Sequence, residues 1–393
     1  RWLASPEWPG FRGADRSGRQ RGVKFSDDWN AHPPRLLWKI DVGPAWSAFA
    51  VAGKLLFTQE QRGPLEVVVC YDADSGREIW VRSIESRFDE PLGGPGPRAT
   101  PTLADGGLFV QGAAGDVMRL DPKTGEIVWR QDLRKLAERA PPMWGFSSSP
   151  LVTHGVVVVH AAGKEDKGVI ALAADDGRLR WSTAAGEHSY SSPHLLQLGD
   201  DQLIGITSNT GLDLLDPTTG QARLRYDWTV QQYRALQPTV VDAESLLLPT
   251  GMGAGTRRLK LAKAASGDSI TAQEVWTSRN LKPDFNDIVV HDGYIYGFDA
   301  AMFTCIDLKD GSRKWKGGRY GKGQALLLAD SNLLLIVAES GELALVRATP
   351  DRFEELAKIP ALEGKTWNHM VVVGDCLYLR NAAQAACYQL TTE

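Results

Sequence analysis

One short motif recurs along this chain and restricts its fold more than any other feature. An Asp is followed four residues later by a Gly, and a Trp stands four residues after that Gly. Complete copies occupy residues 72–80, 121–129 and 307–315. Two further copies each depart at one position: Leu224 replaces the Trp in residues 216–224, and Ala173 replaces the Asp in residues 173–181. A motif of fixed length that recurs in this way predicts a repeat architecture.

The motif has the chemistry of a β-hairpin turn. Pro122 and Pro217 stand where a type I turn requires a φ near −65°. The Gly can adopt the left-handed conformation that closes such a turn, and the Asp can accept backbone N–H bonds inside it. Residues 117–120 and 126–129 alternate between apolar and polar side chains on either side of the turn. Each copy therefore predicts the last hairpin of a sheet.

Two more apolar strands precede each hairpin, as in residues 100–110 and 149–159. Four short strands in each unit, at the ~40–50-residue spacing of propeller repeats, predict one propeller blade per unit. Eight inner strands begin near Ser47, Ala99, Ser148, Ser191, Leu236, Asn286, Gln324 and Asn368. The sequence therefore predicts an all-β fold, an eight-bladed β-propeller of four-stranded antiparallel blades.

The two ends of the chain predict how the ring closes. The last blade has no fourth strand, because the sequence ends three residues after Leu390. Residues 36–40 form a strand pattern around Trp38 with no blade before it. We expect this strand to complete the last blade, which removes an open sheet edge. Residues 1–393 then form a single propeller domain, in which residues 1–34 are an N-terminal extension packed on the propeller and residues 35–42 are the outer strand of the last blade.

The repeat resembles that of one known family. Residues 119–129 are similar to the Ala-Leu-Asp-x-x-Thr-Gly-x-x-x-Trp repeat of pyrroloquinoline quinone (PQQ) dehydrogenases and their non-catalytic, BamB-like relatives. Residues 7–13, with Trp8-Pro9, resemble a segment of the same proteins. The resemblance implies a PQQ-like propeller in which a set of repeat Trp residues docks between neighbouring blades. These are Trp38, Trp80, Trp129, Trp181, Trp276 and Trp315.

The quinoprotein alcohol dehydrogenases resembled here use an adjacent Cys-Cys pair over PQQ and a Glu/Asn/Asp set around calcium. This chain has four Cys, and none are adjacent. No Cys/His pair has the spacing of metal ligands. We therefore expect no metal site, no catalytic residues and no cofactor, and PQQ with calcium stays an alternative.

The composition of the chain limits the kinds of partner that the protein can bind. The net charge is −4 and no basic run exists, which argues against nucleic acid. The apolar runs are too short for a transmembrane segment. The sequence starts at Arg1, and we expect a signal peptide to have been removed from a periplasmic or otherwise extracytoplasmic protein. We expect a monomer that binds a protein partner or a small polar or carbohydrate ligand.

The best candidates for ligand binding stand where each inner strand begins, because these positions surround the mouth of a propeller's central channel. Aromatic, Arg and amide side chains there suit a polar ligand, including an anion. The candidates are Trp46, Arg98, Trp144, Tyr190, Arg234, Gln237, Asn286, Asp287, Gln324, Asn368 and His369.

Three functions fit these observations. We favour a non-catalytic, extracytoplasmic scaffold that binds a protein or a ligand. One alternative is a PQQ-dependent alcohol or sugar dehydrogenase with a divergent site. Another is a carbohydrate-binding propeller in which Trp46, Trp144, Tyr190 and Trp367 serve as stacking platforms.

Overall fold

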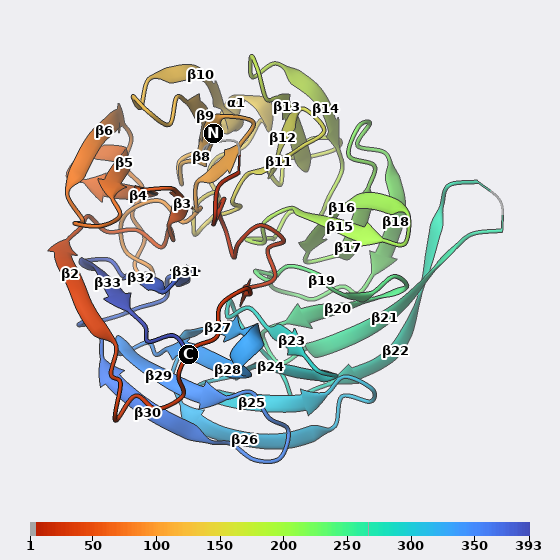
Figure 1. Cartoon of the computed structure of the whole chain (residues 1–393). Helices are drawn as coiled ribbons and strands as arrows, with labels where there is room; N and C mark the ends of the chain where they lie inside the picture. The colour runs from red at the N-terminus through yellow and green to blue at the C-terminus, as the bar shows by residue number, and fades with distance from the viewer. Residues whose placement is uncertain (1–4, 266) are drawn as a thin grey trace.

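The computed structural model describes residues 5–265 and 267–393. Eight antiparallel sheets stand around a central axis, so the predicted eight-bladed propeller is confirmed (Figure 1). Blades 1 and 2 consist of β3 (Ala50–Ala52), β4 (Leu55–Arg62), β5 (Leu65–Asp72) and β6 (Glu78–Glu85), then β7 (Thr102–Ala104), β8 (Gly107–Gln111), β9 (Asp116–Leu120) and β10 (Ile127–Asp132). Blades 3 and 4 consist of β11 (Leu151–Thr153), β12 (Val156–His160), β13 (Val169–Ala173) and β14 (Leu179–Thr183), then β15 (His194–Leu198), β16 (Asp201–Ser208), β17 (Gly211–Leu215) and β18 (Ala222–Asp227).

The second half of the ring repeats this order. Blades 5 and 6 consist of β19 (Thr239–Asp242), β20 (Ser245–Thr250), β21 (Gly255–Lys263) and β22 (Ile270–Ser278), then β23 (Val289–His291), β24 (Tyr294–Asp299), β25 (Met302–Asp307) and β26 (Arg313–Arg319). Blade 7 contains β27 (Gln324–Leu328), β28 (Leu333–Val337), β29 (Glu342–Arg347) and β30 (Glu355–Pro360), and blade 8 contains β31 (Val371–Val373), β32 (Cys376–Arg380), β33 (Gln384–Gln389) and β2 (Arg35–Asp41). Three short elements complete the chain: β1 (Arg19–Gln20), α1 (Leu133–Leu136) and the 3-10 helix η2 (Ala329–Ser331).

The ring closes as the sequence predicts. Strand β2 pairs antiparallel with β33, and Trp38 lies opposite Cys387. The N-terminal strand is thus the outer strand of the blade made from the C-terminal residues. Among the described residues, no helix is both long and apolar enough to span a bilayer.

The repeated turn has the expected hydrogen bonds. In the first copy, Gly76 N donates to Asp72 O over 2.8 Å, and Asp72 Oδ1 accepts from Ser75 N over 2.9 Å. Gly76 has a φ of +70°, a conformation in which Gly is strongly preferred. The strands on either side are out of register by one residue between Cys70 and Tyr71, which is a β-bulge.

The repeat Trp residues join neighbouring blades. Trp129 Nε1 donates to the carbonyl of Ala174 in the next blade over 3.0 Å, and Trp38 Nε1 donates to that of Ala73 over 2.9 Å. Every one of these rings except Trp315 also covers the Gly of the adjoining turn. A Cβ added at Gly125 would lie 2.5 Å from the Trp80 ring, so this Gly serves both the turn and the contact between blades.

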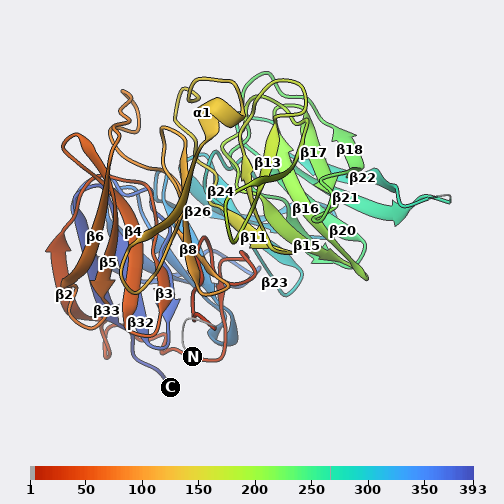
Figure 2. The same cartoon turned by 90° about the horizontal axis from the view of Figure 1, so that it is seen from above.

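The two faces of the ring differ. Figure 2 shows α1 on one face, which we call the upper face, and both chain ends on the opposite, lower face. The connections that lead into the inner strands run along the upper face. The N-terminal segment, residues 8–20, crosses the lower one.

Candidate functional site

A cavity of about 580 Å³ lies at the upper end of the central channel. Its position follows from the fold, because each connection returns from an outer strand to the axis and enters the next inner strand there. Eight of the eleven candidate residues line it: Trp46, Arg98, Trp144, Tyr190, Gln237, Asp287, Gln324 and His369. The structure brings these residues together from distant parts of the chain, and their role in ligand binding stays a prediction.

The other three candidates lie between blades and not in the cavity lining. Arg234 is 1% exposed and donates to the carbonyls of Ser208 in blade 4 and Trp228 in the connection that leads to blade 5. Asn286 Nδ2 donates to Gly323 O, and Asn368 Nδ2 donates to Ser47 O over 2.8 Å. Asn286 and Asn368 thus join the residues before one inner strand to those before the next.

Two clusters of aromatic rings form opposite walls of the cavity. Trp144, Tyr190 and Tyr233 precede the inner strands of blades 3, 4 and 5, with ring centroids 4.6–5.4 Å apart. Trp46 and Trp367 precede those of blades 1 and 8, and their centroids are 4.7 Å apart. Burial raises the pKa of Tyr233 to about 12, so its hydroxyl remains a hydrogen-bond donor at neutral pH.

Charged side chains in the upper part of the cavity are matched by opposite charges or by polar contacts. Arg98 pairs with Glu90 over 2.9 Å, and Lys322 pairs with Asp284. Glu339 Oε1 accepts from the Trp367 indole over 2.8 Å. Another set of lining residues was not predicted, because they lie in the N-terminal segment or in connections of irregular length, neither of which the repeat describes. They are Phe11, Glu90, Leu92, Tyr233, Met252, Asp284, Phe285, Lys322, Glu339 and Lys365.

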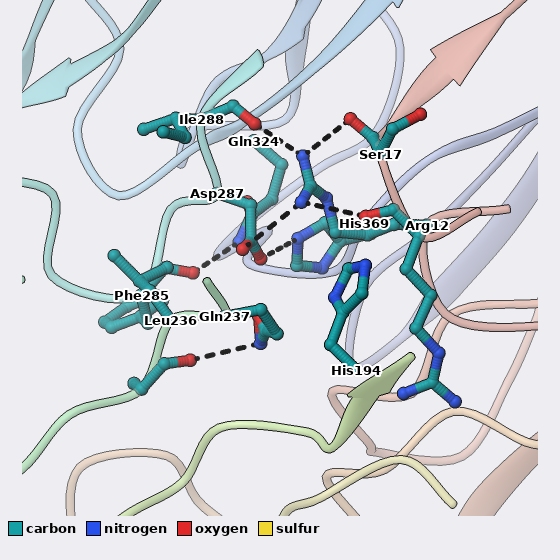
Figure 3. A network of polar contacts seen from close by, with 12 residues as sticks. Arg12, Ser17, His194, Leu236, Gln237, Phe285, Asp287, Ile288, Gln324 and His369 are labelled. Atoms are coloured by element: carbon teal, nitrogen blue, oxygen red, sulfur yellow. Dashed lines mark hydrogen bonds and ion pairs between the residues drawn. The ribbon is translucent and has the colours of Figure 1, made fainter. Parts of the chain in front are cut away.

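An ion-pair network forms the floor of the cavity (Figure 3). Arg12 Nη1 lies 3.4 Å from Asp287 Oδ1, and His369 Nε2 lies 3.0 Å from Asp287 Oδ2. Burial alone would raise the pKa of Asp287, but Arg12 and His369 outweigh it and the net direction is downward. Asp287 is therefore an anion held by Arg12. Burial lowers the pKa of His369, which favours its neutral form.

The N-terminal segment closes the lower end of the channel. Arg16 donates to the carbonyls of Pro150 over 2.6 Å and Pro193 over 2.7 Å. His194 Nε2 lies 3.1 Å from Asp15 O, and β1 pairs in parallel with β27. Residues 1–4 lie outside the described residues. The prediction from the sequence is that residues 1–34 pack on the propeller. It did not identify Arg12 and Arg16 as the side chains that enter the channel.

The residues present do not fit PQQ and calcium as the dehydrogenases resembled above bind them. Cys70, Cys305 and Cys387 are buried in the strands of three blades, away from the described cavity lining. Asp287 and Asp284 are already paired with Arg12 and Lys322. In residues 5–265 and 267–393 no group of three or more His, Cys, Asp or Glu is placed to hold a metal ion.

The blades and the repeat define this chain as a PQQ-like eight-bladed propeller. The model of the family described as outer membrane protein assembly factor BamB matches residues 30–141 and 65–317, so the chain belongs to this family. BamB of Bordetella pertussis is 25% identical over 314 residues, which cover 74% of this chain and 73% of that protein. BamB of Burkholderia pseudomallei is 23% identical over 355 residues, 84% of each chain.

Solved structures show the same fold. BamB from Moraxella catarrhalis superposes with a TM-score of 0.63 at 16% identity, and the match covers 91% of this chain and 97% of that one. A quinohemoprotein alcohol dehydrogenase from Comamonas testosteroni superposes with a TM-score of 0.67 at 13% identity, over 98% of this chain and 80% of that one. At these identities the likeness concerns the fold alone, and the two structures belong to proteins of different function.

Proposed function

We propose that this chain is a non-catalytic, extracytoplasmic scaffold whose propeller binds a protein partner. Membership of the BamB family supports this function, because the family is named for outer membrane protein assembly. The chemistry of the cavity supports it as well, since the ion-paired carboxylates and the position of the Cys residues do not fit the site of the quinoprotein dehydrogenases.

The observation that carries the proposal is a band of exposed apolar side chains on the outer strands of four consecutive blades. These strands, β2, β6, β10 and β14, follow one another around one side of the ring (Figure 1). We call these side chains the outer apolar band: Leu36, Leu37, Ile79, Ile127, Val128 and Leu179, which are 37–54% exposed.

The residue before the blade-joining Trp is apolar in three blades of the band, as Leu37, Ile79 and Val128, but it is Arg180 in blade 3. Val128 precedes the blade-joining Trp129, and Lys314 precedes Trp315 in blade 6. Arg223 precedes Leu224 in blade 4. Apolar residues stand at this position in blade 5, as the exposed Val275, and in blade 7, as the half-buried Leu356. Apolar side chains on neighbouring strands that also have a free edge are typical of a surface that another protein covers.

The test places a photo-crosslinking amino acid at position 128, or at position 314 as a matched control, in the native host. We expect discrete crosslinked partners from position 128 and none of the same partners from position 314, with Ile79→Glu reducing the yield. Indistinguishable products from the two positions would contradict a partner surface on the outer apolar band.

The dehydrogenase alternative is tested separately. Purified protein is mixed with PQQ and Ca²⁺, and the reduction of a redox dye is followed with alcohols and sugars as substrates. We expect no dye reduction that depends on PQQ. Turnover that requires both PQQ and substrate would overturn the non-catalytic function.

A further inference from the structure

We infer that the central cavity is a binding site for a neutral, polyhydroxylated ligand, namely the terminal sugars of a glycan. This inference goes beyond the scaffold function, and it concerns a different surface from the outer apolar band. It rests on three properties of the cavity. Arg98, Lys322 and Arg12 are each paired with a carboxylate, and the two remaining lining charges, Glu339 and Lys365, are of opposite sign. Hydroxyls and amides of the inner wall have unused hydrogen-bonding capacity, and aromatic rings form two of the sides.

The balance of charge favours a ligand without net charge. Arg98 would be the natural partner of an anion, but Glu90 already holds it over 2.9 Å, and both side chains are less than 10% exposed. Arg12 is likewise held by Asp287 at the floor. An anionic ligand, which the sequence allows, would have to compete with these internal carboxylates for the Arg side chains. Bringing a further negative charge into such a poorly solvated site costs free energy.

A row of hydroxyl groups supplies hydrogen-bond donors. Ser149 Oγ accepts from Thr100 N over 3.0 Å, and Ser192 Oγ accepts from Ser149 N over 2.8 Å. Thr100 Oγ1 accepts in the same way from Ala48 N. All three hydroxyls line the cavity, and among the described residues none of them donates its own proton to the protein. Each hydroxyl is therefore fixed as an acceptor and retains a donor for a ligand.

Two amide side chains supply acceptors. Gln324 Nε2 donates to Trp367 O over 3.0 Å and to Phe285 O over 3.2 Å, which fixes the orientation of this amide. Its Oε1 has no partner within the described part of the chain, although the residue is only 1% exposed. Gln237 Oε1 lacks a partner in the same way, and both residues line the cavity. Sugar hydroxyls both donate and accept, so they match amide oxygens and protein hydroxyls together.

The aromatic walls of the cavity also suit a sugar ligand. The C–H face of a sugar ring is apolar and can pack on an aromatic ring, while its hydroxyls remain in the plane of the sugar. Trp144 stands on one side of the cavity and Trp46 on the other. A volume of about 580 Å³ falls within the ~300–1,000 Å³ of small-molecule sites. Because Phe11 and Arg12 close the floor, a glycan chain would enter with its end first.

The experiment uses the full chain and isothermal titration calorimetry. The neutral probes are cellobiose, maltose, lactose and N,N′-diacetylchitobiose. The charged probes are digalacturonic acid and the cationic disaccharide of glucosamine. We expect one-to-one binding of at least one neutral probe, and binding at least tenfold weaker for the charged ones. Failure of every neutral probe at 10 mM, or tighter binding of a charged probe, would overturn the inference.

Longer oligosaccharides of the sugar that binds distinguish its source. Affinity that rises with chain length indicates the end of a polysaccharide, which extends past Leu92 and Met252 at the mouth. Affinity that is independent of length indicates that only the terminal sugars of the glycan are bound, and affinity that falls as the chain lengthens indicates a free sugar.

Variants locate the binding. Trp144→Ala should weaken it at least tenfold, whereas Met143→Ala should leave it unchanged, because Met143 is 76% exposed and is not among the described residues of the lining. Ser192→Ala is a second, smaller change that removes one donor, and it should weaken binding about threefold to tenfold. Circular dichroism verifies that each variant is folded. Binding that is unaffected by both Trp144→Ala and Ser192→Ala would place the sugar elsewhere and overturn the inference. Crosslinking from position 128 does not depend on these results.

Discussion

Both ends of the central channel are bounded by the same ring of inner strands, but the side chains at the two ends form different hydrogen bonds and ion pairs. At the lower end, Arg16 is 6% exposed and donates to the backbone carbonyls of Ser149, Pro150 and Pro193. At the upper end, Arg98 donates to the Glu90 carboxylate as well as to the carbonyls of Gly94 and Gly96. Hydroxyl and amide groups there keep hydrogen-bonding capacity, as at Ser192 and Gln324.

This difference shows how one fold can separate stability from binding. Buried polar backbone groups must find partners, and at the lower end the chain supplies them from its own N-terminal segment. That end is thereby a fixed part of the structure. At the upper end, the hydroxyls and amides that contact the backbone use only part of their hydrogen-bonding capacity, so the remainder is available to a ligand. The following predictions test this separation.

The largest effect is expected at the floor of the cavity. Asp287→Ala leaves the Arg12 guanidinium buried without its carboxylate, and removing one partner of a buried pair costs about 3–5 kcal/mol. Glu90→Ala, the matched change at the upper end, should cost about 1–2 kcal/mol. Both guanidinium groups keep carbonyl partners, but the side chains of the Arg98–Glu90 pair are 7% and 9% exposed, against 2% and 4% for Arg12 and Asp287. Urea unfolding measures both values, and equal losses would contradict the distinction between the two ends.

A double variant supplies the control for the buried pair. Arg12→Met combined with Asp287→Leu removes both charges, and apolar replacements of a buried pair are often neutral. We expect this variant to regain most of the stability that Asp287→Ala loses. A double variant as unstable as the single one would mean that the pair itself is not the cause.

The next largest loss of stability is expected from Arg16, which helps to close the lower end of the channel. Arg16→Met removes hydrogen bonds to three buried carbonyls, and we expect a loss of about 2–3 kcal/mol. Limited proteolysis should then cut within residues 8–20, where the parent protein resists. Arg21→Met is the control, because Arg21 is exposed, and it should change stability by less than about 0.5 kcal/mol.

Acid should weaken the lower end through His194. Burial, with Arg16 and Arg12 nearby, lowers the pKa of His194 to about 3. The unfolded chain binds this proton near pH 6.5, so the folded state loses up to about 1.4 kcal/mol per pH unit as the pH falls below 6.5. The loss continues until the pH approaches 3.

His194→Gln should therefore reduce the slope of unfolding free energy against pH between 6.5 and 4.5, while His160, whose pKa burial lowers to about 4, keeps its own contribution in both proteins. Asp287 does not interfere in this window. Its pKa is lowered in the folded state, so its stabilisation is present above the unfolded value of about 3.9 and is lost only below it. Parallel pH profiles for the variant and the parent protein would show that His194 is not buried as a neutral group.

The fold could be predicted because its determinants are local and recur. Gly125 and Trp129 belong to one hairpin, and the hairpin reappears with little change in neighbouring blades. Ring closure also followed from the sequence, since the strand around Trp38 had no other blade to join. These features depend on short-range chemistry that a single sequence displays.

The candidate site could be predicted only in part. The repeat shows where each inner strand starts, which was enough to place Trp46 and Gln324 at the cavity. It does not show which of two adjacent side chains faces the axis, and Asn286 points toward the next blade while Asp287 lines the cavity. The role of Arg16 in closing the lower end of the channel was not predicted, because its carbonyl partners are more than 130 residues away in sequence.

The smallest effect is expected at the mouth of the upper end. Met252 is 46% exposed and Leu92 is 63% exposed, and neither contributes to the packing of a blade. Met252→Ser and Leu92→Ser should each change the unfolding free energy by less than about 0.5 kcal/mol, as exposed substitutions usually do. Phe11 lies at the closed floor, where its aromatic ring packs edge-on against His369 and its side chain is 9% exposed. Phe11→Ser should therefore lower the free energy of unfolding several times more. A loss at Met252 comparable to that at Phe11 would mean that the upper connections also support the ring, and the separation of a structural end from a binding end would fail.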